Sequence, residues 1–117
     1  MEKTIEIDGR QVKLKNTAGF PIRYRAQFGR DFFADMFKMK SLEKFTEKNP
    51  EDLTYEEMKQ IDFETFYNVI WVLAKTADKS IPDPLTWLDG FDEFPVEDII
   101  IQSQDMIAQT LQSSKKK

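Results

Sequence analysis

Apolar residues are densest between residues 61 and 79, and their spacing there predicts a buried central helix. Phe66, Ile70 and Ala74 recur at four-residue steps, which is the spacing of one helical face. Other apolar side chains cover most of the remaining circumference, and a helix that is apolar on nearly every side is typical of an element enclosed by its own domain. We therefore expect a central helix over Asp62–Lys79, with the other elements packed around it.

Residues 4–14 show the alternation that is typical of a β-hairpin. Apolar and polar residues alternate on both sides of the pair Asp8-Gly9, with apolar side chains at Ile5, Ile7, Val12 and Leu14. An Asp-Gly pair favours a tight hairpin turn because both residues tolerate a positive φ. A lone hairpin is only marginally stable in water, so we expect its apolar face to pack on the helices.

Helical spacing and helix-end signals predict further helices on both sides of the central one. The first is expected to run from a cap at Asn16-Thr17 to Phe28, and the second from about Arg30 to about Glu47. Two short helices are expected at 55–60 and 84–89, and a last helix from Pro95 onwards. Gly29 either ends the first of these helices or permits a tight approach to a neighbouring element, and Asp83 with Pro84 begins the segment 84–89. The inner stripe of the last helix is expected to comprise Val96, Ile99, Ile100, Ser103, Ile107 and Leu111.

The predicted fold class is mainly α, within the α+β class: an N-terminal β-hairpin followed by about four to five helices around the central helix. A chain of 117 residues suits one domain. We expect that domain to span residues 1–112, with residues 113–117 as a Lys-rich flexible tail. No run approaches the roughly 20 apolar residues of a membrane-spanning helix. The charged N-terminus carries no apolar leader, so an intracellular, non-membrane location is expected.

The composition argues against enzymatic and cofactor chemistry. The chain has no Cys and no His, which removes thiolate chemistry, the usual general base at neutral pH and the commonest metal ligand. Carboxylates are plentiful, and two groups could supply an acid pair: Asp62 with Glu64, and Asp89 with Asp92 and Glu93. Nothing in the sequence implies that these groups are buried, so we interpret them as caps and loop charges. No catalytic residue, metal site or cofactor is predicted.

Nucleic-acid binding rests on a single basic and aromatic cluster, which comprises Arg23, Tyr24, Arg25, Phe28 and Arg30. The net charge of -4 and the pI of about 4.9 are unfavourable for a protein that binds a phosphate backbone. Asp31 and Asp35 follow the cluster at once, so we expect the arginines to pair with acids and to cover apolar surface with their stems. No nucleic-acid partner is predicted.

The predicted second helix carries more apolar surface than the core of one small domain needs. Its stripe comprises Phe28, Phe32, Met36 and Met39. Phe33 and Phe37 lie about 100° round the helix from that stripe. Large exposed apolar patches mark partner sites. We therefore predict a surface that faces another protein or a second copy of this chain, comprising Phe33, Phe37, Met39 and Trp71. The alternative is that these side chains complete the core.

Four stretches of the chain stand in a distinctive order: IDGR in the hairpin, RYRAQFGRD at 23–31, IWVLAKTAD at 70–78 and IPDPLTWLDGF at 81–91. Together they resemble the tail assembly chaperones of long-tailed phages that infect Gram-positive bacteria. The resemblance extends over about residues 5–107. The positions that match the family pattern, which we interpret as structural, are Arg23, Tyr24, Gly29, Asp31, Lys75, Asp78, Trp87 and Asp89.

The resemblance implies a non-enzymatic function. Such proteins bind the aggregation-prone tape measure protein, help recruit tail tube subunits, and are absent from the finished virion, so the host bacterial cytoplasm is the expected location. Many are made in two forms through a programmed frameshift, and the codons of Lys115–Lys117 are a candidate slippery stretch. A solubilising tail is the alternative for these three lysines. The alternative function for the chain is a small cytoplasmic adaptor or regulatory module that uses the same apolar face.

Overall fold

The computed structural model describes the fold of residues 1–39 and 63–115, and the side chains of residues 1–35 and 64–110. The predicted short helix at 55–60, the Asp62 cap and the C-terminal part of the predicted second helix lie outside the described residues.

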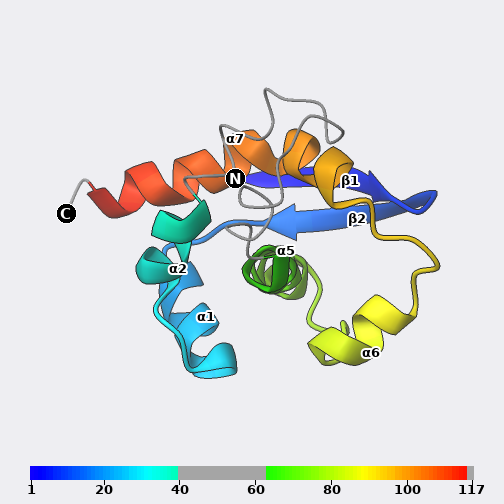
Figure 1. The fold of residues 1–117 in the computed structure, drawn as a ribbon, viewed down its shortest axis with the longest axis horizontal. Coiled ribbons are helices and arrows are strands. Elements are labelled where there is room, and N and C mark those ends of the chain that lie inside the picture. The colour runs from blue at the N-terminus through cyan, green and yellow to red at the C-terminus, as the bar shows by residue number, and fades with distance from the viewer. Residues whose placement is uncertain (40–62, 116–117) are drawn as a thin grey trace, which may run out of the picture.

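The described chain forms an N-terminal β-hairpin followed by five helices, which confirms the predicted fold class (Figure 1). In chain order the elements are β1 (Glu2–Ile7), β2 (Arg10–Lys15), α1 (Phe20–Phe28), α2 (Phe32–Met39), α5 (Phe63–Ala77), α6 (Pro84–Asp89) and α7 (Val96–Lys115). Within the described residues, no helix is long and apolar enough to cross a membrane.

The hairpin closes through the Asp-Gly turn that the sequence predicts. Asp8 has a φ of 53° and Gly9 a φ of 75°, and Ile7 pairs directly with Arg10 in an antiparallel register. Two successive positive φ values match a two-residue turn whose twist suits the flanking strands. The four apolar side chains of the strands are all buried, as predicted: Ile5, Ile7, Val12 and Leu14.

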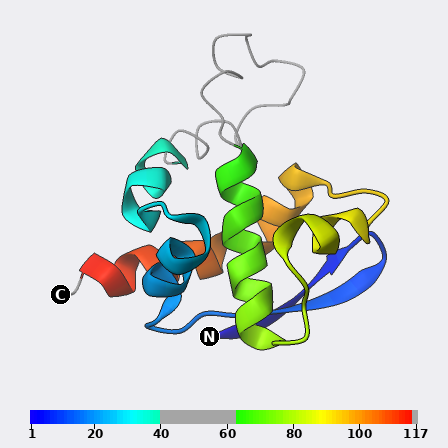
Figure 2. The same ribbon diagram turned by 90° about the horizontal axis from the view of Figure 1, so that it is seen from below.

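Helix α5 is the centre of the domain. It packs against β2, while α1 and α2 lie on one side of it and α6 on the other (Figures 1 and 2). Every residue from Val69 to Ala74 is buried, and so is Phe66. Full burial of one large aliphatic side chain stabilises a fold by about 1.5–3 kcal/mol, so this helix supplies much of the apolar stabilisation. The predicted central helix is confirmed, although it ends at Ala77, two residues before Lys79.

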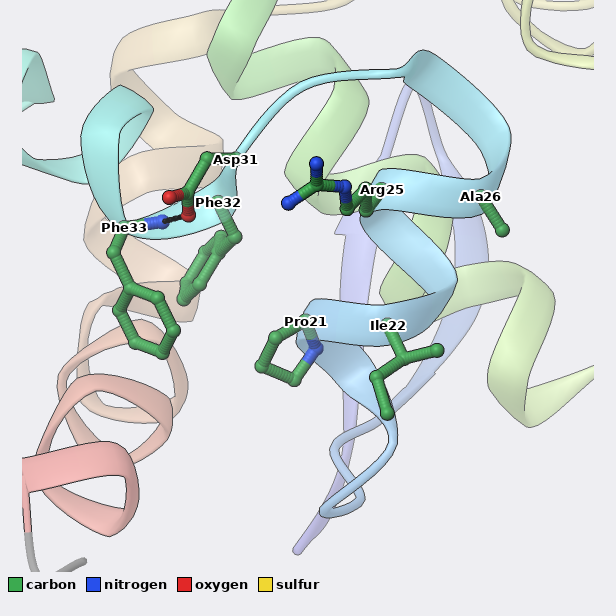
Figure 3. A pocket seen from close by; sticks show the side chains of 7 residues that line it. All are labelled: Pro21, Ile22, Arg25, Ala26, Asp31, Phe32 and Phe33. Atoms are coloured by element: carbon green, nitrogen blue, oxygen red, sulfur yellow. Dashed lines mark hydrogen bonds between the residues drawn. The ribbon is translucent and has the colours of Figure 1, made fainter.

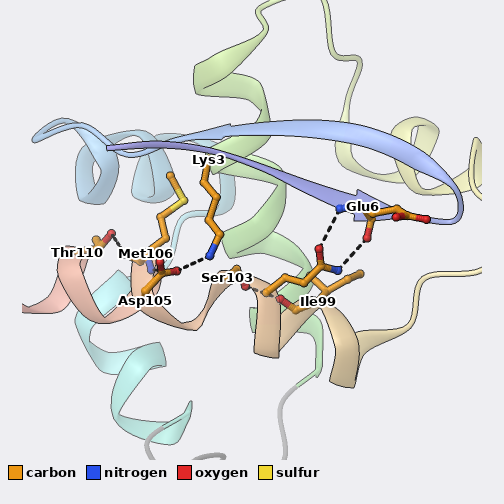
Figure 4. Close-up of polar contacts among 8 residues, drawn as sticks. Lys3, Glu6, Ile99, Ser103, Asp105, Met106 and Thr110 are labelled. Atoms are coloured by element: carbon orange, nitrogen blue, oxygen red, sulfur yellow. Dashed lines mark hydrogen bonds and ion pairs between the residues drawn. The ribbon is translucent and has the colours of Figure 1, made fainter.

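Helix α7 runs along β1 and closes that edge of the hairpin (Figure 4). The side-chain amide of Gln102 donates to the carbonyl oxygen of Glu6 at 2.9 Å and accepts from the backbone N–H of Glu6 at 3.0 Å. The ammonium of Lys3 pairs with the carboxylate of Asp105 at 2.9 Å, and this hydrogen bond lowers the pKa of Asp105. Side chains of α7 therefore satisfy polar groups on the outer edge of β1.

The inner face of α7 agrees in part with the predicted stripe. Its buried side chains are Ile99, Ser103, Met106 and Thr110. The hydroxyl of Ser103 donates to the carbonyl of Ile99, and that of Thr110 donates to the carbonyl of Met106. Because these hydroxyls are satisfied within the helix, they can face the core. The other predicted positions with described side chains are half-buried: Val96, Ile100 and Ile107.

The predicted start of the first helix is wrong. Helix α1 begins at Phe20 after Gly19, with no side-chain cap, because the turn before it is closed by the bond from the Phe20 N–H to the Thr17 carbonyl. The cap predicted at Asn16-Thr17 is therefore absent. Helix α7 continues to Lys115, so the tail predicted to begin at residue 113 is helical over its first three residues.

Candidate functional site

Helix α1 has one buried face and one open face. Phe20 and Tyr24 are four residues apart and buried, and Phe28 continues the same stripe against the core. The residues between them point away from α5, since they lie on the opposite side of the helical wheel. On that open face Pro21, Ile22, Arg25 and Ala26 border a single hollow.

Gly29 and Asp31 set the direction of the next helix. Gly29 ends α1 with a φ of 67°, a conformation in which L side chains are strained, and its N–H bonds the carbonyl of Arg25. Asp31 then accepts the backbone N–H of Phe33 at 2.9 Å, which is the bond of a helix N-cap. This start turns Phe32 into the core, where it is 1% exposed, and leaves Phe33 at the surface, 37% exposed.

The open face of α1 and the first residues of α2 enclose a groove of about 480 Å³ (Figure 3). Its lining residues are Pro21, Ile22, Arg25, Ala26, Asp31, Phe32 and Phe33. Ile22 is 75% exposed, the largest exposure among the large apolar side chains in the described part of the chain. We call this feature the α1–α2 groove. Its lining is mostly apolar, with one cation and one carboxylate at the rim.

A buried polar network holds the two walls of the groove together. The hydroxyl of Tyr24 donates to one carboxylate oxygen of Asp35 at 2.7 Å, and the guanidinium of Arg30 donates to the other at 2.9 Å. Asp35 is only 4% exposed. Burial raises the pKa of Tyr24 well above its ordinary value, and the Asp35 carboxylate raises it further. The prediction that an arginine of this cluster pairs with an acid is confirmed for Arg30 and Asp35.

Arg30 is paired with Asp35, whereas the guanidinium of Arg25 is exposed and accessible to a ligand. Its side chain extends from α1 towards the start of α2, across the mouth of the groove (Figure 3). Within the part of the chain that the structure describes, no carboxylate lies within ion-pair distance of Arg25 or of its neighbour Arg23. Both arginines are exposed, and helix α1 contains no acidic residue.

The assignment of Trp71 to the partner surface is wrong, and the side chains of two other predicted members are not among those described. Trp71 is 5% exposed, packs edge-on against Phe28, and donates its indole N–H to the carbonyl of Pro82 at 2.9 Å. A side chain in that position belongs to the core. Phe37 and Met39 lie in α2, but their side chains are not among those described. Phe33 lines the groove, and its contact with a partner stays a prediction.

Sequence reasoning did not single out Ile22 or Ala26 for the partner surface. The available signal was position: Ile22 stands two residues from both Phe20 and Tyr24, which places it about 200° round the helix from the buried stripe. Neither residue belongs to a recognisable motif, so only the assignment of a buried face to α1 could have revealed them.

Several residues that match the family pattern build the turn between α5 and α6. The ammonium of Lys75 donates to the carbonyls of Lys79 and Ile81, at 2.8 and 2.5 Å. The carboxylate of Asp78 accepts from both the hydroxyl and the N–H of Ser80, and these bonds lower the pKa of Asp78. These contacts all lie within the chain and hold the turn together.

The remaining family-pattern residues are also placed by the structure. Trp87 is half-buried and packs edge-on against Phe91 and Phe94. Asp89, at the end of α6, and Arg23, on α1, are exposed. The predicted cap Asp83 is confirmed, since its carboxylate accepts from the Thr86 N–H.

The candidate acid groups are exposed wherever the structure describes their side chains. Glu64, Asp89, Asp92 and Glu93 are all exposed, and Asp62 lies outside the described residues. Within the described residues no group of three or more carboxylates is arranged to hold a metal ion. The α1–α2 groove is therefore the stronger candidate for a functional surface.

No protein-family model, curated protein or solved structure matches this chain.

Proposed function

We propose that this chain is a non-enzymatic assembly chaperone that binds the tape measure protein of a long-tailed phage and assists assembly of the tail tube. The proposal joins the sequence resemblance described above with the chemistry of the α1–α2 groove. Under this proposal the chain also interacts with tail tube subunits, acts in the host bacterial cytoplasm and is absent from the finished virion.

The observation that carries the proposal is the pair of exposed apolar side chains at the groove. Ile22 and Phe33 come from different helices and border the same hollow, with Phe32 beneath them. An open apolar groove between helices suits the apolar face of an amphipathic helix. A long helical client with many such faces would aggregate when unprotected, and a groove of this kind would cover one face at a time.

The first test is co-expression of this chain with a candidate tape measure protein encoded in the same genome. We expect the client to become soluble and to be retained in a pull-down on this chain. Ile22→Asp and Phe33→Asp should each abolish both effects, because a charge would then face the apolar client. Leu85→Asp is the matched control, since Leu85 is a helical aliphatic residue that is 68% exposed on α6, away from the groove.

Two results would contradict the proposal. One is a client whose solubility and retention do not change when this chain is present. The other is equal loss of binding in the Leu85 control, which would place the contact outside the groove. If the client is unaffected but other host proteins are retained through Ile22, the chain is a cytoplasmic adaptor that uses the same groove.

A further inference from the structure

The α1–α2 groove contains one feature that an apolar client alone does not explain, namely the charge of Arg25. Arg25 lies four residues after Pro21 and three after Ile22, so its side chain shares the open face of α1 with them. An apolar segment that covered the groove would bury part of this guanidinium. Burial of an unpaired charge is costly, and a client that carried no carboxylate would therefore bind less well.

The charges around the groove favour an acidic client. Arg23 and Arg25 give the exposed surface of α1 two positive charges and no negative one. The carboxylate at the rim, Asp31, already accepts the N–H of Phe33 and caps α2. Arg30 is held by the buried Asp35. Arg25 is thus the one cation among the residues that line the groove, and it has no ion-pair partner among the described residues.

We infer that Arg25 is a specificity-determining residue, and that the groove selects an amphipathic helix with a carboxylate beside its apolar stripe. The apolar side chains of the client contact Ile22 and Phe33, and its Glu or Asp pairs with the guanidinium of Arg25. A guanidinium presents a planar fork of donors that matches a carboxylate, which gives the contact direction as well as charge. This inference rests on the proposed function, because it describes the client of the same groove.

The inference is tested with three labelled helical peptides that share one apolar stripe and differ only in its flanking positions, which are Glu, Gln or Lys. Binding to the full chain is measured by fluorescence anisotropy at low salt. We expect the Glu peptide to bind about fivefold more tightly than the Gln peptide, because a partly exposed ion pair contributes up to about 1 kcal/mol. The Lys peptide should bind least tightly.

Variants of the two open arginines identify the residue responsible. Arg25→Gln should remove the difference between the Glu and Gln peptides, and Arg25→Glu should make the Lys peptide the preferred ligand. Arg23→Gln is the matched control, because Arg23 is equally charged and exposed on α1 but does not line the groove. It should leave the preference for the Glu peptide in place. Circular dichroism of each variant confirms that the fold is retained.

The outcomes separate this inference from the proposed function. If Ile22→Asp abolishes binding of all three peptides while the wild-type chain does not distinguish Glu from Gln, the groove is the binding site and the role of Arg25 is refuted. If Ile22→Asp changes nothing, the groove itself is refuted. Failure of all three peptides to bind the wild-type chain overturns the inference, whereas the co-expression test still decides the function. Self-association in sedimentation velocity that Arg25→Gln abolishes would assign the groove to a second copy.

Discussion

At the turn between α5 and α6, Trp71 and Lys75 direct their polar atoms to carbonyl oxygens of the same chain. At the α1–α2 groove, the apolar side chain of Ile22 and the guanidinium of Arg25 are exposed to solvent, although both lie on a helix whose other face is buried in the core. The donors of these side chains at the turn are therefore occupied by bonds within the chain, whereas the exposed groups of the groove remain accessible to a partner. The residues on which the proposed resemblance rests include several in the turn, whereas the exposed side chains Ile22 and Ala26 of the groove belong to no motif.

This contrast separates residues that the fold requires from residues that are available for binding. A Trp that bonds a backbone carbonyl, or a Lys that bonds two, is difficult to replace because no other side chain has the same shape and donors. An exposed Ile or Ala is easy to replace without loss of the fold. The predictions below test whether the two regions divide stability and binding in this way, beginning with the network that supports the groove from beneath.

Asp35→Ala should have the largest effect on stability. It removes the acceptor of Tyr24 and the partner of Arg30, and loss of one member of a buried charged network costs about 3 kcal/mol. Urea unfolding followed by circular dichroism measures the change. Asp89→Ala, at an exposed carboxylate on α6, is the control and should leave the unfolding midpoint in place. A midpoint equally insensitive to Asp35→Ala would show that the network does not hold α1 and α2 together.

Alkaline pH should weaken the same network. Because the pKa of Tyr24 is raised in the folded chain, the unfolded chain loses this proton first, and stability falls as the pH rises above the ordinary tyrosine value. One such group lowers the free energy of unfolding by about 1.4 kcal/mol per pH unit above a pH of about 10. Tyr24→Phe should remove this part of the decline, as urea unfolding at stepped pH would reveal. Identical slopes in the two proteins would exclude Tyr24 as the cause.

Trp71→Phe should have a smaller effect, because it keeps one buried aromatic ring and removes the indole N–H with the rest of the bicyclic ring. The carbonyl of Pro82 then loses its donor, which costs about 1 kcal/mol of unfolding free energy. Thermal unfolding by calorimetry is a suitable measurement. Binding of the client in the pull-down should be unchanged, and a loss of binding without a loss of stability would return Trp71 to the partner surface.

Ile22→Ser and Phe33→Ser should change stability least. Ile22 is largely exposed and Phe33 is partly exposed, so we expect a change of at most about 0.5 kcal/mol for the first and about 1 kcal/mol for the second. Both should nevertheless weaken binding of the Glu peptide. If either substitution unfolds the chain, the groove is part of the core and the division between the two regions is wrong.

The elements that local chemistry specifies could be predicted from the sequence. The Asp8-Gly9 turn, the left-handed Gly29 and the Asp83 cap depend on residues whose backbone preferences or side-chain acceptors act within a few positions. The central helix could be predicted because its apolar residues surround the whole helix. The phase of α7 could be predicted in part, since Ile99 and Ser103 are buried as expected. Thr110 gave no apolar signal, but its hydroxyl is satisfied within the helix and it is buried as well.

The groove could be predicted only in part. Phe33 was recognisable because it stands beside a regular stripe, but Trp71 was assigned to the surface on the count of apolar residues alone. Its burial depends on α5 being surrounded by other elements and on a carbonyl eleven residues away, and neither follows from local spacing. Likewise, the exposure of Ile22 depends on which face of α1 meets α5, and this is a property of the tertiary structure.

The side-chain amide of Gln102 affects the tendency of the chain to aggregate through the edge of β1. A free strand edge offers unpaired N–H and C=O groups to any other extended segment, and this is a common route to aggregation. Gln102 occupies both groups of Glu6, so at this position β1 cannot accept a further strand. This blocked edge keeps the sheet from serving as a template for intermolecular β-structure at this position, which would suit the proposed function.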